Sequence, residues 1–484
     1  MLNPTIFREN DIRGIAERDL TSEGVEHLGL ALGTYFQRNA GPKVNIGRDC
    51  RLSGDRLNLA LRTGLIASGC HVTDIGVVPT PVTYFSAMKR KADGAVMITG
   101  SHNPKDYNGF KSVCGENSLH GHAIQELLHL IQNRDYAQGQ GSYAQLDIVD
   151  DYVDAVTGGF SFPRRIKVAV DAGNGTAGPV MAKILAKLNV ESTNLYFDMD
   201  GTFPNHHQDP TVMSNLTDLV ANLYFEMDGT FPNHHPDPTV MSNFTDLVAK
   251  IRETGAELGI GFDGDSDRIG TVDENGEPVY GDMLMLAFAR EILTRKPGAT
   301  FIGEVKCSQV MYDELARLGG RPIMWKTGHS LIKTKMKEEK AELAGEMSGH
   351  MFFADRYFGY DDALYAACRI MEIVSKSGQP LSHQFDRLPK LVSTPEIRLE
   401  AHDETKFDVV ARVAAHFTKT RRIVDVDGAR VIFPKGWGLV RASNTQPVLV
   451  MRFEAESQAL LDEYRAEVES VLIRETGAPL RETH

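Results

Sequence analysis

The sequence predicts an α/β protein with three similar α/β domains, whose sheets are mixed but mainly parallel, and a C-terminal α+β domain. A central cleft between these domains would hold the active site. Three observations support this prediction. The 484 residues exceed what one hydrophobic core accommodates. From residue 44 onward, short apolar strands alternate with amphipathic helices, and the alternation begins again near residues 166 and 299. The final segment instead contains hairpin-like strands followed by one long helix.

The first domain shows the pattern most clearly. Residues 44–49 (VNIGRD) read as a strand, and Leu57, Leu61 and Leu65 then recur on one face of a helix that would end near Gly69. Residues 71–76 (HVTDIG) and 94–99 (GAVMIT) are the next strands. Strands that alternate with helices in this way form a mainly parallel sheet covered by helices.

The later domains follow from similar signals. A strand at 166–171 and a helix at 180–188 begin the second domain, and ATFIGEV (299–305) supplies a strand of the third. The strands VIFPKGWGLVRAS (431–443) and PVLVMRFEAE (447–456), with a helix from about residue 457 to 475, indicate the α+β domain. The expected domain limits are 1–153, 154–277, 278–389 and 390–484.

A tandem duplication interrupts the second domain. Residues 194–221 and 222–249 are 28-residue copies that differ only at Asp198/Glu226, Gln208/Pro236 and Leu216/Phe244. Two copies are too few for a solenoid, so we interpret them as one strand-loop-helix piece present twice. We expect either copy to fill the single place in the domain, the surplus to lie at the sheet edge or to bulge from a loop, and the active-site loops to stay undisturbed while the second domain is the least ordered. The histidine pairs at 206–207 and 234–235 have no carboxylate or cysteine at a ligand-like spacing in a rigid element, which disfavours a metal site.

Composition narrows the function classes. The formal net charge of −13 argues against a nucleic-acid or anionic-membrane partner, and an anionic substrate would need a local basic cleft. We find no signal peptide and no apolar stretch of about 18 residues. The five cysteines are odd in number and form no CxxC pair, which is typical of a reducing compartment. A cytoplasmic protein is expected.

The sharpest local motif is TGSHNPKDYNGFK (99–111), which directly follows a predicted strand. Strand ends in parallel sheets open into the crevice where ligands bind. Ser101 would stand there with His102 beside it, and Lys111 would return toward it. A lone serine at such a place is usually part of a polar turn, so the motif as a whole carries the functional interpretation.

A second motif, FDGDSDR (262–268), places Asp263, Asp265 and Asp267 after another predicted strand. Three carboxylates at alternate positions offer a hard divalent cation several oxygen ligands. A calcium loop of the EF-hand type is the competing interpretation, since Glu274 occupies its twelfth position. However, Arg268 stands where that loop requires glycine, and the flanks read as strands.

These two motifs resemble those of the α-phosphohexomutase family, close to its phosphomannomutase/phosphoglucomutase branch. The resemblance implies that Ser101 is a phosphoserine and that the three aspartates bind Mg²⁺ together with an oxygen of Ser101. It also makes Arg268 a phosphate-facing cation.

Other motifs match the family in the same order along the chain, although Asn10 replaces the tyrosine that often precedes DIRG. The resemblance places the following residues around the reacting phosphoryl group and the substrate: Arg13 (NDIRG), Arg48 (GRDCR), Lys306 (EVKCS) and His329 (KTGHS). GEMSGH would recognise the sugar through Glu346, Ser348 and His350. RASNTQP would bind a phosphate through Arg441, Ser443, Asn444 and Thr445, with the guanidinium fork as the bidentate donor.

The resemblance implies an intramolecular phosphotransferase that interconverts hexose 1-phosphates and hexose 6-phosphates of mannose, glucose or both. Phosphorylated Ser101 would give its phosphoryl group to the substrate, and the resulting hexose 1,6-bisphosphate, which also serves as activator, would reorient before returning a phosphate. Lys111 is the expected general base, which requires a lowered pKa, and His329 is the next candidate. We expect a monomer or weak dimer whose partner is the phosphosugar.

Three alternatives remain at this stage. The phosphoglucosamine mutase branch typically has glutamine where this chain has Met347. A phosphatase could use the same serine and metal but needs neither a sugar loop nor a distal phosphate loop. A non-catalytic sugar-phosphate-binding protein would be expected to lack Ser101 or Lys111.

Overall fold

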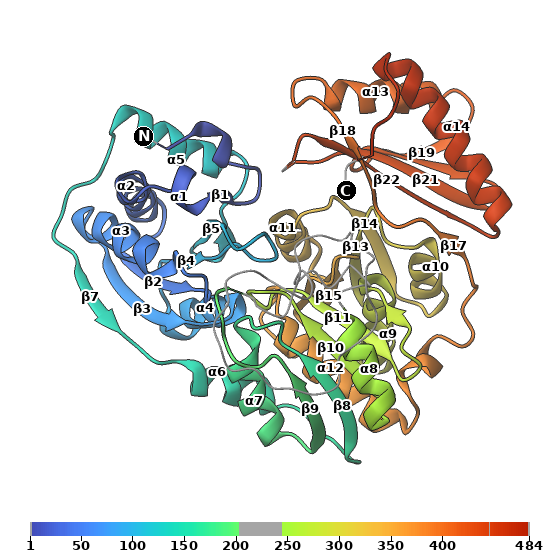
Figure 1. Ribbon diagram of the computed structural model, residues 1–484, viewed down its shortest axis with the longest axis horizontal. Coiled ribbons are helices and arrows are strands. Elements are labelled where there is room, and N and C mark those ends of the chain that lie inside the picture. Colours follow the sequence, from blue (N-terminus) through green and yellow to red (C-terminus); the bar gives the residue numbers. More distant parts are fainter. Residues whose placement is uncertain (1, 203–243, 445, 483–484) are drawn as a thin grey trace, which may run out of the picture.

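The computed structural model describes residues 2–202, 244–444 and 446–482, which form four sheets with flanking helices (Figure 1). Each sheet is built from one consecutive part of the chain, and the fourth lies apart from the first across the top of the molecule (Figure 1). The prediction of three α/β units and a C-terminal α+β unit is confirmed. Within the described residues, no helix is both long and apolar enough to cross a membrane.

The first sheet is mixed. Its strand order is β1-β5-β4-β2-β3-β7, with β4, β2, β3 and β7 parallel and β1 and β5 antiparallel to their neighbours. Glycines bring α2 and α3 into contact, because a Cβ on Gly29 would lie 2.3 Å from the carbonyl oxygen of Leu61. The elements of this unit are β1 (Ile12–Ile15), α1 (Ala16–Asp19), α2 (Ser22–Asn39), β2 (Lys43–Arg48), α3 (Gly54–Ala67), β3 (His71–Val77), α4 (Thr80–Arg90), β4 (Gly94–Ile98), β5 (Tyr107–Cys114), β6 (Asn117–Ser118), α5 (His122–Asn133), β7 (Ser142–Gln145) and α6 (Val149–Thr157).

The second and third sheets repeat this design with fewer strands. Their orders are β12-β11-β10-β8-β9 and β14-β13-β15-β16, each with a parallel part and an antiparallel end. The second unit contains β8 (Ile166–Asp171), α7 (Ala177–Lys187), β9 (Val190–Leu195), α8 (Thr245–Thr254), β10 (Leu258–Phe262), β11 (Ile269–Asp273) and β12 (Pro278–Val279). The third contains α9 (Gly281–Arg295), β13 (Thr300–Glu304), α10 (Gln309–Arg317), β14 (Arg321–Trp325), α11 (His329–Glu339), β15 (Leu343–Gly345), β16 (Met351–Phe353) and α12 (Ala363–Ser377).

The fourth sheet is antiparallel. Its order is β17-β22-β21-β20-β19, and β18 also pairs with β22. The hairpin strands predicted at 431–443 and 447–456 correspond to β20–β21 and β22. The elements are β17 (Val392–Ser393), β18 (Ile397–Glu400), α13 (Lys406–Phe417), β19 (Arg422–Val424), β20 (Ala429–Phe433), β21 (Gly436–Ala442), β22 (Val448–Ala455) and α14 (Gln458–Thr476).

Most of the first unit has a hydrophobic core of its own, but its helix α4 belongs to a second core that runs through the second and third units. Side chains of α4, including Tyr84 and Phe85, belong to the same buried cluster as the strands of the second sheet and the helices α9 and α12. Tyr84 meets Tyr360 edge to face at 5.6 Å between ring centroids, and Phe85 meets Tyr152 in the same way. The fourth unit has a core of its own. The first three units therefore pack as one body, to which the fourth is joined.

The duplicated segment divides between its two copies. The strand β9 takes its end from the upstream copy, whereas the helix α8 begins in the downstream copy. Tyr196 of the upstream copy donates to Asp246 Oδ2 of the downstream copy at 2.6 Å. The cause is chain connectivity, because α7 ends at Lys187 just before β9 and α8 ends at Thr254 just before β10. Our expectation that one whole copy fills the place is wrong. The surplus residues, the expected lower order and the paired histidines concern positions outside the described residues.

Candidate active site

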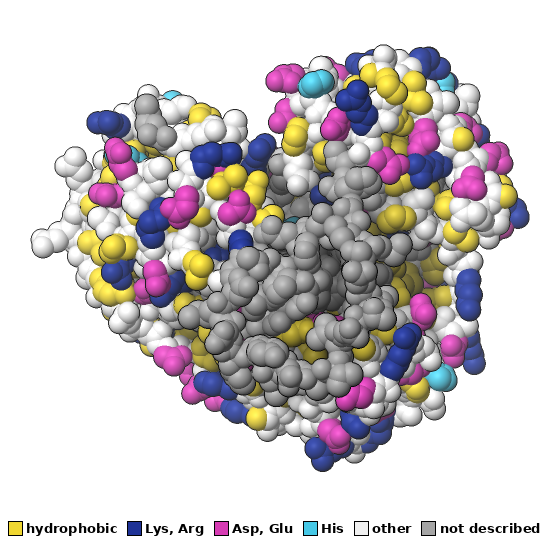
Figure 2. Space-filling view, viewed as in Figure 1, with side chains coloured by type: hydrophobic (Ala, Val, Ile, Leu, Met, Phe, Trp, Pro, Cys, Tyr) yellow, Lys and Arg dark blue, Asp and Glu magenta, His cyan; other side chains and the backbone are white. Residues whose placement is uncertain are grey.

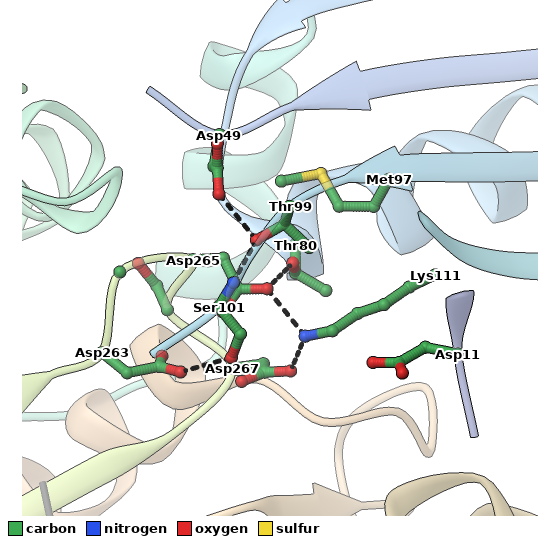
Figure 3. A network of polar contacts seen from close by, with 12 residues as sticks. Asp11, Asp49, Thr80, Met97, Thr99, Ser101, Lys111, Asp263, Asp265 and Asp267 are labelled. Atoms are coloured by element: carbon green, nitrogen blue, oxygen red, sulfur yellow. Dashed lines mark hydrogen bonds and ion pairs between the residues drawn. The ribbon is translucent and has the colours of Figure 1, made fainter. Parts of the chain in front are cut away.

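The site forms where the loop after β4 meets the loop after β10 (Figure 3). Ser101 Oγ donates to Asp263 Oδ2 at 3.0 Å, although the two residues lie 162 positions apart. Ser101 is 2% exposed and has a φ of +51°, a left-handed conformation that costs energy for any residue except glycine. The preceding Gly100 is required, since a Cβ there would lie 2.5 Å from Arg51 Cζ. The loop thus holds one serine hydroxyl against a carboxylate.

Arg51 holds this serine loop in place. Its Nη2 donates to the carbonyl oxygens of Ser101 at 2.8 Å and Asn103 at 2.5 Å, and its Nε pairs with Asp49. Asp49 Oδ2 in turn accepts from Thr99 Oγ1 at 2.8 Å. A buried guanidinium offers several donors in a fixed fork, which suits it to fixing a loop through its carbonyls.

Arg48, which we expect near the phosphoryl site, contacts two carboxylates of its own unit. Arg48 Nε donates to Asp55 at 2.9 Å, and Nη1 lies 3.4 Å from Asp74 Oδ1. Arg48 ends strand β2, and its side chain turns to these two carboxylates, while Arg51 three residues later contacts the serine loop. Both arginines belong to the GRDCR motif, and Arg51 is the one whose guanidinium donates to the serine loop.

Two other predicted residues flank Ser101. His102 Nδ1 lies 3.2 Å from Ser101 Oγ. Arg13 Nη1 donates to Asn103 Oδ1 at 2.9 Å, and its Nη2 pairs with Asp11 at 2.5 Å. Arg13 is aligned with Gly109 through the pairing of β1 with β5, which brings the arginine to the serine loop.

Asp263, Asp265 and Asp267 lie close together near Ser101, and all three are fully buried. Their carboxylate oxygens lie within 4.8 Å of one another. Asp265 Oδ1 and Asp267 Oδ1 are buried without a hydrogen-bond partner in the described structure. Burial, followed by the charges of Asp267 and Asp265, raises the pKa of Asp263 well above its ordinary value. Three neighbouring carboxylates with buried oxygens that lack a hydrogen-bond partner fit a hard divalent cation such as Mg²⁺.

Lys111 forms ion pairs with two of these carboxylates (Figure 3). Its Nζ donates to Asp265 Oδ2 at 2.7 Å and to Asp267 Oδ2 at 2.5 Å. Burial alone would lower the pKa of Lys111, but the charges of Asp265 and Asp267 outweigh it and raise the pKa above the ordinary lysine value. The lowered pKa that we expected for a lysine base is therefore wrong.

Two histidines face the same region. Arg268 Nε donates to His350 Nε2 at 3.0 Å, so the proton of a neutral His350 ring lies on Nδ1. That nitrogen is 3.4 Å from Asp361 Oδ2 and 3.8 Å from Asp267 Oδ1. Asp267, His350 and Asp361 could by distance form a second metal site. However, the proton on Nδ1 occupies the position that a metal would need.

His329, at the start of α11, stacks on His350 with 5.7 Å between ring centroids. Burial, followed by the positive charge of Lys333, lowers the pKa of His329 well below its ordinary value. His329 is therefore neutral at pH 7 and able to accept a proton.

The predicted sugar loop, residues 345–350, includes His350. Glu346 Oε1 accepts from the amide of Gly328 at 2.7 Å, and Ser348 Oγ donates to Glu346 Oε2 at 3.5 Å. A Cβ on Gly328, whose φ is +132°, would lie 3.2 Å from Asn10 Oδ1. Asn10 of the first unit thus packs against Gly328, the residue before α11.

The predicted phosphate loop follows β21. Arg441 Nε donates to Asp427 Oδ2 at 2.9 Å, and Ser443 Oγ accepts from the amide of Gln446. Asn444 is half-buried, and Thr445 lies outside the described residues. Lys306, after β13, pairs with Glu396 at 3.0 Å and with Glu304 at 3.5 Å. In the space-filling view, the molecule is notched at its upper edge between the first and fourth units (Figure 2).

The structure therefore groups the predicted residues into three neighbouring sets. The first surrounds the serine hydroxyl: Ser101, His102, Arg13, Lys111, Asp263, Asp265, Asp267 and Arg268. The second consists of Glu346, Ser348 and His350 of the predicted sugar loop together with His329, which stacks on His350. The third is Lys306 with Arg441 and Ser443. Sequence reasoning missed Arg51, Asp361 and Thr80, of which Thr80 Oγ1 donates to Asp265 Oδ2 at 2.6 Å.

Comparisons with known families agree with this architecture. Four models of phosphoglucomutase/phosphomannomutase match: alpha/beta/alpha domain I over 4–138, domain II over 150–223 and again over 212–276, domain III over 280–392, and the C-terminal domain over 396–471. The double match of domain II is what a duplicated segment produces. The chain belongs to the phosphoglucomutase/phosphomannomutase family of α-D-phosphohexomutases.

Individual relatives are similar over almost the whole chain. A phosphomannomutase/phosphoglucomutase of Pseudomonas syringae is 44% identical over 463 residues, which are 96% of this chain and 94% of the relative. A phosphoglucomutase of Neisseria gonorrhoeae is 40% identical over 472 residues, 96% of each chain. A crystal structure of a phosphoglucomutase/phosphomannomutase family protein from Burkholderia thailandensis has a TM-score of 0.88 and 40% identity, and it covers 99% of this chain and 100% of its own.

Proposed function

We propose that this chain interconverts hexose 1-phosphates and hexose 6-phosphates, with Ser101 as the phosphoryl carrier. One observation supports this above all. The Ser101 hydroxyl lies within hydrogen-bond distance of Asp263, and Asp263 belongs to a buried set of three carboxylates. A sugar loop and a phosphate loop come from two other units. A phosphatase needs only the first of these arrangements, whereas a mutase needs all three.

In the first half-reaction, the free hydroxyl of the substrate attacks the phosphorus atom of phosphorylated Ser101. The new O–P bond forms as the bond to Ser101 Oγ breaks, which gives a hexose 1,6-bisphosphate. The bisphosphate reorients, and Ser101 Oγ then takes the other phosphate. Arg13 and Arg268 stabilise the oxygens of the transferring group. Asp263, Asp265, Asp267 and an oxygen of Ser101 would hold Mg²⁺, which neutralises negative charge at the phosphoryl group when bound.

The proton of the attacking hydroxyl goes to a histidine in this proposal. Lys111 is held protonated by two carboxylates, so it fits the role of acid and charge stabiliser. His329 is neutral and buried beside His350, so its ring is in the form that can accept a proton. The distal phosphate would lie between Lys306 and Arg441, and Glu346 with Ser348 would bind ring hydroxyls.

We propose mannose and glucose phosphates as substrates and keep phosphoglucosamine as the alternative, since Met347 stands where that branch typically has glutamine. The net charge of −13 supports a protein without nucleic-acid or membrane partners. We further propose a cytoplasmic monomer or weak dimer, a hexose 1,6-bisphosphate as activator, and the domain limits 1–153, 154–277, 278–389 and 390–484.

Intact-mass measurement tests the carrier. The chain is incubated with glucose 1,6-bisphosphate, and we expect the mass of one phosphoryl group to be added, with no addition to Ser101→Ala. Coupled assays on the 1-phosphates of mannose, glucose and glucosamine then rank the substrates. A chain that gains no phosphoryl group and turns over none of the three sugars would refute the proposal and favour a binding protein.

A further inference from the structure

The loop that carries Lys306 is held by the fourth unit as well as by its own, in which the amide of Ser308 donates to Asp282 Oδ2 at 2.8 Å. This loop, residues 304–308, joins β13 to α10. Three successive carbonyl oxygens in it accept hydrogen bonds from two arginines. Arg430 Nη1 donates to the carbonyl oxygens of Val305 at 2.6 Å and Cys307 at 2.9 Å. Arg452 Nη1 donates to the carbonyl oxygen of Lys306 itself.

Both arginines are buried, at 0% exposure for Arg430 and 5% for Arg452. Trp437 stacks with them, with its ring centroid 3.8 Å from Arg430 Cζ and 5.8 Å from Arg452 Cζ. Trp437 Nε1 donates to Glu454 at 2.9 Å. In the described part of the chain, no carboxylate forms an ion pair with Arg430, so carbonyl dipoles and an aromatic face balance its buried charge. When the charge of a buried arginine is compensated mainly by the carbonyl oxygens of one loop, the arginine holds that loop in place.

The register of strands β20, β21 and β22 relates these two arginines to Arg441 of the predicted phosphate loop. Leu439 of β21 pairs with Arg430 on one side and with Arg452 on the other. Side chains alternate along a strand, so Trp437, Leu439 and Arg441 share one face of β21 with those paired arginines. One face of the fourth sheet therefore holds the Lys306 loop and also presents Arg441.

We propose that Arg430 and Arg452 are positioning residues that set Lys306 against Arg441, so that two cations from different units bind the distal phosphate together. The inference rests on the proposed function. Without these two arginines, the 304–308 loop loses three hydrogen bonds. The Lys306 ammonium then loses its fixed distance to Arg441. Substrate affinity falls, whereas phosphoryl transfer at Ser101 is left intact.

A double-mutant cycle tests this through KM. Arg430→Gln is made in the unmutated chain and in Lys306→Met, and KM and kcat for glucose 1-phosphate are measured. We expect Arg430→Gln to raise KM about tenfold in the first background and less than about twofold in the second, with kcat nearly unchanged in each. Equal factors in both backgrounds would show that Arg430 acts independently of Lys306 and would overturn the inference.

A matched control comes from the same unit. Arg421 also stacks on an aromatic ring, with its Cζ 4.6 Å from the Phe433 centroid, and pairs with Glu467. Glu467 and Phe433 both lie in the fourth unit, so Arg421→Gln should leave KM unchanged. If Arg430→Gln does not fold, Arg452→Gln takes its place in the cycle.

The failure of the proposed function looks different. In that case the unmutated chain turns over no hexose phosphate, and the cycle is run on the dissociation constant of inorganic phosphate, measured by calorimetry with chelator present. Coupling between Arg430 and Lys306 in that constant supports the positioning role without any turnover, and its absence overturns it.

Discussion

Two matched deletions test how the duplicated segment divides between its copies. Deleting residues 194–221 or residues 222–249 leaves 456 residues in each case (484 − 28). The products differ at three positions only, because the first keeps Glu226, Pro236 and Phe244 and the second keeps their counterparts. Connectivity gives both products one strand and one helix in the same place. Both should have the kcat of the full chain, and the first should be at least as stable as the full chain.

The two products should differ in stability because of one buried side chain. Phe244 is 5% exposed, and its ring lies against Gly261, where a Cβ would be 2.5 Å from Phe244 Cε1. It packs in a small cluster with Leu247, Ile251 and Val272. In the product that lacks 222–249, Leu216 takes this place and leaves part of the ring volume unfilled. The free energy of unfolding should be lower by about 1 kcal/mol.

Urea unfolding followed by circular dichroism measures this difference, and Leu216→Phe in the less stable product should restore most of it. Any part that is not restored belongs to Gln208 and Asp198. If the two products are equally stable, or if Leu216→Phe has no effect, Phe244 does not fill the core as described. An inactive product from both deletions would show that the surplus residues support the active site.

The remaining predictions concern the site. Lys111→Met should lower kcat by about 10²–10⁴ and leave KM near its original value, and an unchanged kcat would remove Lys111 from the reaction. Asp265→Asn should raise the Mg²⁺ concentration needed for half-maximal rate, whereas activity of the unmutated chain that persists in chelator would refute the metal site. Arg441→Ala should raise KM strongly because the distal phosphate loses a bidentate partner, and no change would place that phosphate elsewhere. Since the pKa of His329 is lowered, its neutral form persists below pH 6.5, so the acid limb of kcat/KM should lie below that pH and should change in His329→Gln. An acid limb that is identical in the variant would assign the proton to another group.

The motifs indicated which loops come together in the fold, because most of them follow a strand of a predicted sheet. Ser101 and Asp263 could be assigned from their loops, since strand ends at a sheet edge are where such side chains meet. The choice between Arg48 and Arg51 could not be made, because both lie in one motif and only the turn after β2 decides which side chain faces the serine loop.

The protonation state of Lys111 could not be predicted from the sequence either. It depends on Asp265 and Asp267, which lie more than 150 positions away along the chain. Periodicity describes local structure, whereas a pKa depends on charges that only the tertiary fold brings close. The division of the duplicated segment had a usable signal that we did not apply, namely the short connections from α7 to β9 and from α8 to β10.

The first unit has a core of its own, but its helix α4 is buried in the core of the next two units, which limits how this enzyme can be divided into fragments. Helix α4 belongs to the first unit, but its Tyr84 and Phe85 are buried in a core that lies mostly in the second and third units. A fragment cut between these units exposes apolar surface on both sides of the cut, so each half is prone to aggregate. The fourth unit keeps its own core and is joined through a small cluster of Val305, Trp437 and Leu439. Exchange of parts between homologous enzymes should therefore succeed at the boundary before the fourth unit and fail at the two boundaries before it.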